Sequence, residues 1–230
     1  MLILALDTAG ENCAVALAKT GDGLSVLARR NEVIGRGHAE RLMPMIGEVL
    51  AEAGLTYADL ERIAVTTGPG SFTGTRIGVA AARGLALALA IPAVGVGVLD
   101  ALIEAAGVEA NDVIVAALDA RRGEIYAKAI RPNDGKIIYD AQVTTAADLA
   151  QAIAGLGGEP VTLTGSAAAS VAQVLSERGV MAAIAGEAAS ADISTVAALG
   201  ALAESGKSPA PLYLRPPDAK PQTGMAVARK

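Results

Sequence analysis

The sequence is almost without aromatic residues: it has no Trp, one Phe and four Tyr among 230 residues. Any core must therefore be built from Ala, Val, Leu and Ile. Enough of these are present, because hydrophobic residues make up 52% of the chain, and a chain of this length can bury a sizeable interior. The length allows one large domain or two small ones.

Cysteine and histidine occur once each, as Cys13 and His38. One cysteine excludes a disulfide within the chain and is typical of a reducing compartment. Zinc sites use three or four ligands, usually His or Cys, so no metal site is predicted. A peptidase would have to combine a nucleophile such as Ser71 with His38, whose place at the start of a predicted helix is more typical of a capping or surface residue.

Positive charge is also in the minority, with 19 basic against 24 acidic residues and a net charge of -5. Such a chain has no overall field for a polyphosphate backbone, so we do not expect it to bind nucleic acid tightly by itself. The first residues, MLILALDTAG, lack the basic region of a signal peptide. The apolar stretch 77–99 contains Arg83 and is broken by Pro92, which disfavours a membrane span. We expect a cytoplasmic protein with no membrane contact.

Strand and helix signals alternate along the first half of the chain. LILALD, CAVALAK and LSVLARRNEV predict three antiparallel strands. A helix is predicted from about 38 to 53, then a buried strand in ERIAVTTG, a second helix over 73–90 and a strand in PAVGVGV. This order predicts an α/β layer of mixed strand directions.

The pattern then begins again, which suggests a duplicated unit. VIVAALDARRGEIYAKAI repeats the opening hairpin, and VTLTGSAAASVAQVLSERG resembles AVTTGPGSFTGTRIGVAAARG. The alternative is that any α/β chain yields such hairpins twice. The duplication predicts an N-terminal lobe over 1–106 that carries the two helices and a smaller C-terminal lobe over 107–206, with the boundary near 104–111. A Pro-rich extended tail follows over 207–230, and we expect its last residues to be disordered.

The loop GPGSFTG, residues 68–74, lies between a strand and a helix, where backbone amides can bind anions. The spacings of the P-loop and of the dinucleotide-binding motif are both absent. The favoured interpretation is a tight turn in which Ser71 or Thr73 caps the helix. The alternative is the remnant of a nucleotide or phosphate site, whose residues would be Asp7, Gly70, Ser71, Arg76 and Asp119.

Asp7 and Asp119 each follow a strand at a hairpin. In two-lobed phosphotransferases, acids at such places hold a metal-bound water or orient a phosphate acceptor, so a small phosphotransferase or ATPase that uses these two residues is the alternative function. Against it, the segment after Asp119 lacks a second Gly-rich loop. An aspartate that accepts hydrogen bonds from turn amides is the simpler interpretation for each.

The helix over 73–90 has small residues, Gly74, Gly78, Ala81 and Ala82, at positions that share one face. Each internal Gly costs a helix up to about 1 kcal/mol relative to Ala, so the pattern needs a reason. Close approach of another helix would supply one. That neighbour could be the first helix of the same chain, or helices of another molecule packed on an apolar face that includes Leu42, Met45, Ile46 and Val49.

Several segments together resemble the TsaB (YeaZ) family: ILALDTA, GHAERLMPMI, TTGPGSFTGTRIGVAAARGLALAL, IPAVGVGVLDAL, LDARRGEIY and PLYLRPP. The resemblance is strongest over 1–126. It implies two duplicated α/β lobes of the actin-like or Hsp70-like ATPase fold, which is also ribonuclease H-like. It further implies a degenerate paralogue of TsaD, which transfers threonylcarbamoyl to tRNA adenosine next to the anticodon. The positions that resemble the metal-binding His pair of TsaD are here Val98 and Leu102.

The resemblance implies a non-catalytic subunit that binds and activates TsaD. The helices near 38–53 and 73–90 are expected to contact TsaD, or a second copy of this chain when TsaD is absent, and the ATPase TsaE is expected to join the pair. ATP and metal are then expected on the partner subunits, no cofactor on this chain, and tRNA bound only through the complex. The predicted contact residues are Leu42, Met45, Ile46, Val49, Phe72, Ile77, Gly78, Val79 and Ala82.

Overall fold

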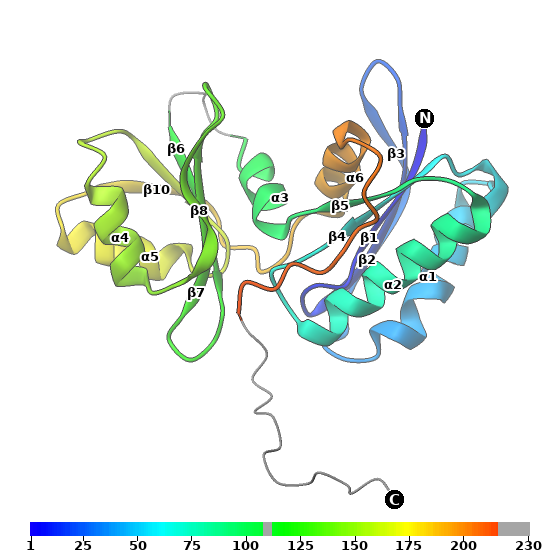
Figure 1. The fold of residues 1–230 in the computed structure, drawn as a ribbon, viewed down its shortest axis with the longest axis horizontal. Coiled ribbons are helices and arrows are strands. Elements are labelled where there is room, and N and C mark those ends of the chain that lie inside the picture. Colours follow the sequence, from blue (N-terminus) through cyan, green and yellow to red (C-terminus); the bar gives the residue numbers. More distant parts are fainter. Residues whose placement is uncertain (108–111, 216–230) are drawn as a thin grey trace, which may run out of the picture.

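The computed structural model describes residues 1–107 and 112–215. Part of the predicted lobe boundary at 104–111 and the last residues of the predicted tail lie outside these ranges. The chain forms two halves that lie side by side, each with its own sheet (Figure 1).

The first sheet contains five strands in the order β3-β2-β1-β4-β5. The predicted antiparallel meander is confirmed, because β1 pairs antiparallel with β2 and β2 with β3. β4 and β5 add parallel to β1 and to each other. The elements of this half are β1 (Leu2–Asp7), β2 (Asn12–Thr20), β3 (Leu24–Val33), α1 (His38–Glu52), the 3-10 helix η1 (Tyr57–Asp59), β4 (Arg62–Thr66), α2 (Phe72–Leu89), β5 (Ala93–Val96) and α3 (Val98–Ala105).

The second sheet repeats the first, in the order β10-β9-β6-β7-β8. β6, β7 and β8 form the antiparallel meander, and β9 and β10 add in parallel. The same strand order and directions in both sheets confirm the predicted duplication. The elements are β6 (Val113–Asp119), β7 (Ile125–Arg131), β8 (Lys136–Thr144), α4 (Ala146–Ala154), β9 (Val161–Thr164), α5 (Ala168–Glu177), β10 (Ala182–Gly186) and α6 (Ile193–Leu202).

Both faces of the first sheet are buried, and its strands divide their side chains between them. Along β1, Leu4 and Leu6 face α1 and α2, whereas Ile3 and Ala5 face α6. The α6 face is rich in alanine, and Gly200 of α6 lies so close to Ala64 of β4 that a Cβ at Gly200 would overlap it. The scarcity of aromatic residues is thus met by close packing of small side chains.

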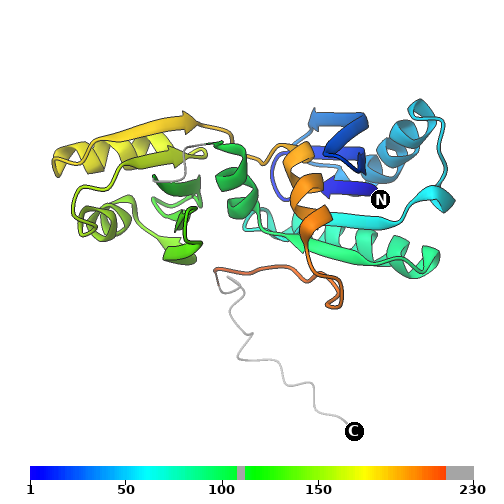
Figure 2. The same ribbon diagram turned by 90° about the horizontal axis from the view of Figure 1, so that it is seen from above.

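The last helix of each half covers the sheet of the other half. α3 packs against β6 and its neighbours, while α6 packs against β1, β2 and β4 (Figure 2). The predicted second lobe over 107–206 therefore needs a correction, because α6 belongs to the layers of the first sheet. The physical reason is that each sheet has two apolar faces to bury, and the two helices of its own half cover only one of them.

Arg62 of β4 holds α6 in this place. Its guanidinium donates to the carbonyl oxygens of Gly200, Ala201 and Ala203, at 3.0, 3.0 and 2.9 Å, where the helix ends. We expect Arg62→Met, which keeps the aliphatic stem, to lower the free energy of unfolding by about 2–3 kcal/mol, since several charge-assisted hydrogen bonds are lost. Urea unfolding would measure this, with exposed Arg83→Met as control. A loss no larger than that of the control would contradict the role.

The described part of the tail crosses from the first half to the second (Figure 1). Pro209 is buried near Gly95 of β5, and the Leu212 N–H donates to the Thr67 carbonyl oxygen at 2.8 Å. Leu214 packs against the cluster between α3 and β6. Arg215 forms an ion pair with Glu124 of the second half. Up to residue 215 the predicted extended tail is thus a segment that joins the two halves.

The apolar stretch 77–99 is divided in the structure among most of α2, a residue in the left-handed conformation at Ala90, strand β5 and the start of α3. Within the described ranges, the structure contains no helix with the length and apolar character that a membrane span requires.

Candidate functional site

The end of β1 forms a buried polar cluster beneath the loop before α2. Asp7 is 1% exposed, and its Oδ1 accepts hydrogen bonds from the Thr66 hydroxyl at 2.6 Å and the Ala9 N–H at 2.9 Å. Burial raises the pKa of the Asp7 carboxyl, while these hydrogen bonds and His38 oppose that rise. Asp7 therefore acts in the structure as an acceptor that closes the turn after β1, in the way proposed as the simpler interpretation.

The loop over 68–74 packs directly on this strand end. The Ser71 N–H donates to the Ala9 carbonyl at 2.6 Å, and the Thr8 hydroxyl donates to the Gly74 carbonyl at 2.7 Å. The Ser71 Oγ accepts from the Gly74 N–H at 3.2 Å, which confirms the predicted helix cap. A Cβ at Gly70 would overlap the Ala9 carbonyl oxygen, and one at Gly74 would overlap that of Thr8. The glycines of this motif are thus required by contacts within the chain.

The five residues predicted as a nucleotide or phosphate remnant do not form one cluster of free side chains. Asp7, Gly70 and Ser71 meet in the packing of the strand end. Arg76 instead turns to the tail, where its Nε donates to the Tyr213 hydroxyl at 2.7 Å. Asp119 belongs to the second sheet, where its N–H donates to Ser166 and its carboxylate accepts from the Arg121 N–H.

The raised pKa of Asp7 predicts a pH dependence of stability. A folded-state pKa above the usual aspartate value of 3.8 means that the folded chain binds this proton more tightly than the unfolded chain. The contribution of Asp7 to stability is therefore fully present below the unfolded-state pKa and falls as the pH rises through the folded-state pKa.

Asp7→Asn keeps the shape and the acceptor oxygen but cannot ionise. We expect the unfolding free energy of the variant, relative to the natural chain, to rise with pH from about 4 and then to level off. Urea unfolding of both proteins over a pH series would measure the difference. Parallel curves, or a difference that falls with pH, would contradict the assignment.

The structure corrects most of the predicted contact residues on the two helices. Leu42 is 1% exposed, and Met45, Ile46 and Val49 are 0% exposed, because this side of α1 packs against β2 in the core of the first half. On α2, three more of the predicted residues are buried: Gly78, Val79 and Ala82. These seven residues are therefore buried within the first half and form no part of its exposed surface. Ile77 is half-buried, and Phe72 is 47% exposed.

The small residues of α2 also have a different neighbour from the one expected. A Cβ at Gly78 would lie 2.5 Å from the Thr8 hydroxyl oxygen and 3.3 Å from Val65. The close approach that Gly74 and Gly78 permit is therefore to the end of β1 and to β4, rather than to another helix.

The opposite sides of α1 and α2 face outward, and small or apolar residues are exposed there beside charged residues such as Glu40 and Arg83. The two helices lie next to each other on one side of the first sheet (Figure 1). We use the name outer helix face for the small and apolar residues on this side. They are Met43, Gly47 and Ala51 on α1, and Ala80, Gly84, Leu87 and Ala88 on α2; all are exposed except Gly47, which is half-buried. Leu87 is 85% exposed and Met43 is 43% exposed.

Glycines 47 and 84 distinguish this face from ordinary surface. A Cβ at either position would meet nothing within 4 Å, so no contact within the chain requires glycine there. Each glycine costs its helix up to about 1 kcal/mol relative to alanine. The sequence contained a signal for this face: once the stripe of Leu42, Met45 and Ile46 is assigned to the core, Met43 and Gly47 must point the other way.

The other residues considered as catalytic or metal-binding candidates, His38 and the positions of Val98 and Leu102, are engaged in structural contacts. His38 is 5% exposed, and its Nε2 donates to the Asn12 carbonyl oxygen at 3.2 Å. Val98 and Leu102 of α3 are buried between the halves. In the part of the chain that the structure describes, no three His, Cys, Asp or Glu side chains gather closely enough to hold a metal ion.

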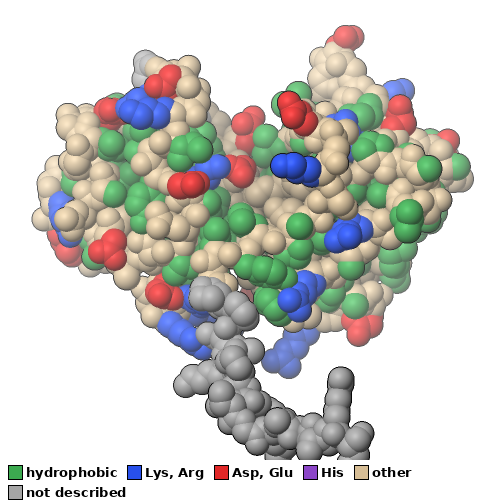
Figure 3. Space-filling model, viewed as in Figure 1, with side chains coloured by type: hydrophobic (Ala, Val, Ile, Leu, Met, Phe, Trp, Pro, Cys, Tyr) green, Lys and Arg blue, Asp and Glu red, His purple; other side chains and the backbone are tan. Residues whose placement is uncertain are grey.

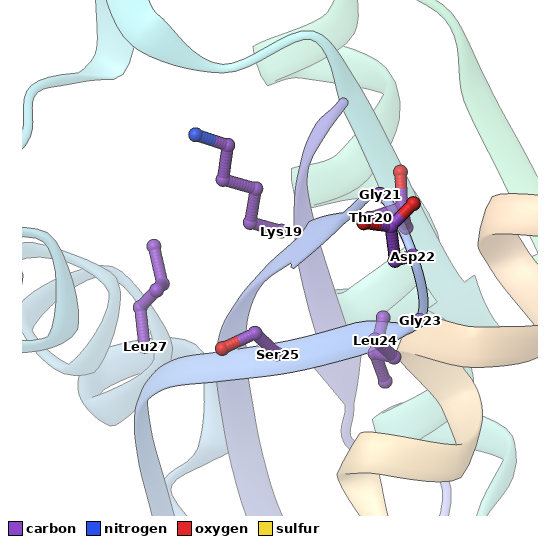
Figure 4. A pocket seen from close by; sticks show the side chains of 8 residues that line it. All are labelled: Lys19, Thr20, Gly21, Asp22, Gly23, Leu24, Ser25 and Leu27. Atoms are coloured by element: carbon purple, nitrogen blue, oxygen red, sulfur yellow. The ribbon is translucent and has the colours of Figure 1, made fainter.

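One surface pocket, of about 410 Å³, lies at the hairpin of β2 and β3 (Figure 4). Lys19 and Leu27 line it beside the turn at Asp22. Because Leu2 pairs with Lys19 and Asp7 with Ala14, this hairpin lies at the end of the sheet away from Asp7. The pocket therefore contributes nothing to the strand-end cluster.

Comparisons with known proteins agree on one family. A family model described as TsaD, tRNA N6-adenosine threonylcarbamoyltransferase, matches residues 31–207. Two relatives named tRNA threonylcarbamoyladenosine biosynthesis protein TsaB, from Haemophilus influenzae and Escherichia coli, are each 40% identical over 127 residues, which are 55% of this chain. YeaZ from Pseudomonas aeruginosa has the same fold, with a TM-score of 0.74 and 28% identity over 93% of this chain and 99% of that one. The chain belongs to the TsaB/YeaZ family.

The chain spans about half the length of these curated relatives, 52% and 53%. A second Pseudomonas aeruginosa structure, described as similar to the peptidase YEAZ, matches this TsaB/YeaZ chain with a TM-score of 0.75, 28% identity, and coverage of 93% and 99%. A ROK hexokinase from Thermus thermophilus, with a TM-score of 0.53 and 14% identity over 88% of this chain and 99% of that one, shares the fold. The two-lobed actin-like fold predicted for the chain is confirmed.

Proposed function

We propose that this chain is a non-catalytic subunit that binds and activates TsaD for threonylcarbamoyl transfer to tRNA adenosine next to the anticodon. The observation that carries the proposal is the outer helix face. It combines apolar exposed side chains with glycines 47 and 84, whose open Cβ positions allow another backbone to approach closely. A face of this kind is suited to helix-on-helix packing with a partner.

Membership of the family supports the identity of that partner. Relatives carry the name of threonylcarbamoyladenosine biosynthesis, and the matching family model is that of TsaD itself, a chain of related fold. In this proposal TsaE joins the pair, ATP and metal are bound by the partner subunits, and tRNA is modified by the complex. The same outer helix face would join two copies of this chain when TsaD is absent.

The strand-end contacts favour a binding subunit over the alternative phosphotransferase. A catalytic acid needs access to substrate, whereas Asp7 is buried under the loop that Gly70 and Gly74 bring onto β1. For the peptidase, the Ser71 oxygen accepts the Gly74 N–H and His38 donates to Asn12, so neither is placed as nucleophile and base for the other.

An omission assay tests the proposal. Unmodified tRNA is incubated with TsaD, TsaE, ATP and threonylcarbamoyl-adenylate, with and without this chain, and the modified nucleoside is quantified. We expect modification only when the chain is present, and none with the chain alone. Equal modification without the chain would refute the proposal, and saturable nucleotide binding by the chain that Asp7→Asn removes would favour the phosphotransferase.

A further inference from the structure

The chain crosses between the two halves twice. It passes from β5 to α3 at Gly97, and from β10 to α6 through residues 187–192. α3 then packs against β6 and α6 against β1, and the two helices touch each other between the halves. Two bodies joined by two short connections can rotate about the line through them, because a few residues at the ends of elements absorb the motion. Figure 3 shows that the surface is hollowed between the halves at the top of the view, which leaves room for such a rotation.

The described tail adds a third link, which begins on the first half. Pro209 is buried against β5, and the Leu212 N–H donates to the Thr67 carbonyl oxygen at 2.8 Å. Pro209 and Pro211 each fix one backbone angle, so this part of the tail is stiff and extended. A stiff segment with a buried anchor can transmit force between the elements at its two ends.

An aromatic contact fixes the middle of the tail to the first turns of α2. The ring of Tyr213 lies 5.1 Å from that of Phe72, centroid to centroid. The Tyr213 hydroxyl accepts a hydrogen bond from the Arg76 Nε at 2.7 Å, and the same guanidinium stacks 3.7 Å above the Phe72 ring. These three side chains hold one another, so the tail is fastened to the first half by its rings as well as by its backbone.

The last two described residues lie on the second half. Leu214 packs in the cluster between α3 and β6, and Arg215 forms an ion pair with Glu124, at the turn that follows β6. The side chains of this pair are 24% and 41% exposed. In Figure 2 the described tail and the connection from β10 to α6 lie on opposite sides of α3. The third link is therefore placed away from that connection, where it can oppose a rotation of the halves.

We infer that residues 209–215, which we call the clasp, hold the two halves at one relative orientation, and that the ion pair of Arg215 with Glu124 is where the clasp opens. The first half is held by a backbone hydrogen bond and stacked rings, whereas the second is held by Leu214 and this partly exposed pair. Opening of the pair frees the halves to rotate about the two connections. The inference goes beyond the proposed function and concerns the chain by itself.

The test measures the distance between the halves in the full chain by double electron–electron resonance. Nitroxide labels are placed at Ala58→Cys in the first half and Ser176→Cys in the second, both exposed positions. The natural Cys13 is 0% exposed, and burial raises the pKa of its thiol to about 11, so it stays unlabelled. Labelled chain is mixed with an excess of unlabelled chain, so that only distances within one molecule are recorded.

Charge reversals open the clasp without a change in the core. Arg215→Glu and Glu124→Arg each replace the attraction by a repulsion, and the double variant Arg215→Glu/Glu124→Arg restores an opposite pair. The control is Arg30→Glu, which breaks the ion pair of Arg30 with Glu52 inside the first half, where the two side chains are 37% and 46% exposed.

We expect a single narrow distance distribution for the natural chain, and a population of other distances that is roughly tenfold larger in each single reversal. The double variant and the control should give the natural distribution. Natural distributions in both single reversals would overturn the inference. It would also be overturned by a double variant as broad as the single ones, or by equal broadening in the control.

Discussion

Gly74→Ala is expected to remove about 3–5 kcal/mol of folding free energy, a large part of the 5–15 kcal/mol typical of a protein domain. The added Cβ would overlap the Thr8 carbonyl oxygen, which is main chain and cannot move to another rotamer. The same shift would disturb the hydrogen bond from the Thr8 hydroxyl to the Gly74 carbonyl and the cap from Ser71. Urea or thermal unfolding would measure the loss.

The matched control makes the same change on the same helix at Gly84. A Cβ there meets nothing within 4 Å, so Gly84→Ala is expected to stabilise the chain by up to about 1 kcal/mol through helix propensity alone. If the two variants had equal stability, the loop over 68–74 would not be seated on the end of β1 as the structure has it.

Gly84→Glu is expected to weaken binding of TsaD at least about 100-fold while the chain itself stays folded. The position is exposed on the outer helix face, so the fold tolerates a larger side chain. In the complex, the carboxylate would stand between two closely packed helices without a partner, at a cost of several kcal/mol, and each 1.4 kcal/mol is a factor of ten in affinity.

Gln173→Glu adds the same charge at an exposed position of α5 in the second half and serves as control. Binding of TsaD by each chain is measured by titration calorimetry or analytical ultracentrifugation. Natural affinity of the Gly84→Glu chain would place the contact elsewhere. Leu42→Asp is unsuited to this test, because a carboxylate at a residue that is 1% exposed would unfold the chain.

The strands, the duplication and the cap at Ser71 could be predicted because each leaves a local pattern. Apolar runs that stop at Asp7 and Asp119 mark equivalent hairpins, and strand order follows from the repeat. The exchange of α3 and α6 between the halves leaves no such pattern. It depends on which sheet face is still uncovered, a property of the whole fold rather than of residues 193–202.

The orientation of α2 could not be predicted for a related reason. Gly78 and Gly84 belong to opposite sides of the helix, yet both are small, so periodicity alone does not say which side is buried. Only the position of Thr8 decides that Gly78 faces inward. On α1 the amphipathic stripe through Leu42 and Ile46 was visible, but its assignment to a partner rather than to the core was wrong.

Activation of TsaD through the outer helix face is tested most directly by the initial rate of modified nucleoside formation, with TsaD, TsaE, ATP, threonylcarbamoyl-adenylate and tRNA held constant while this chain is titrated. We expect a rate that rises from near zero to saturation with the natural chain and with Gln173→Glu, and that stays near zero with Gly84→Glu over the same range. A rate independent of the chain, or modification by the chain without TsaD, would contradict it.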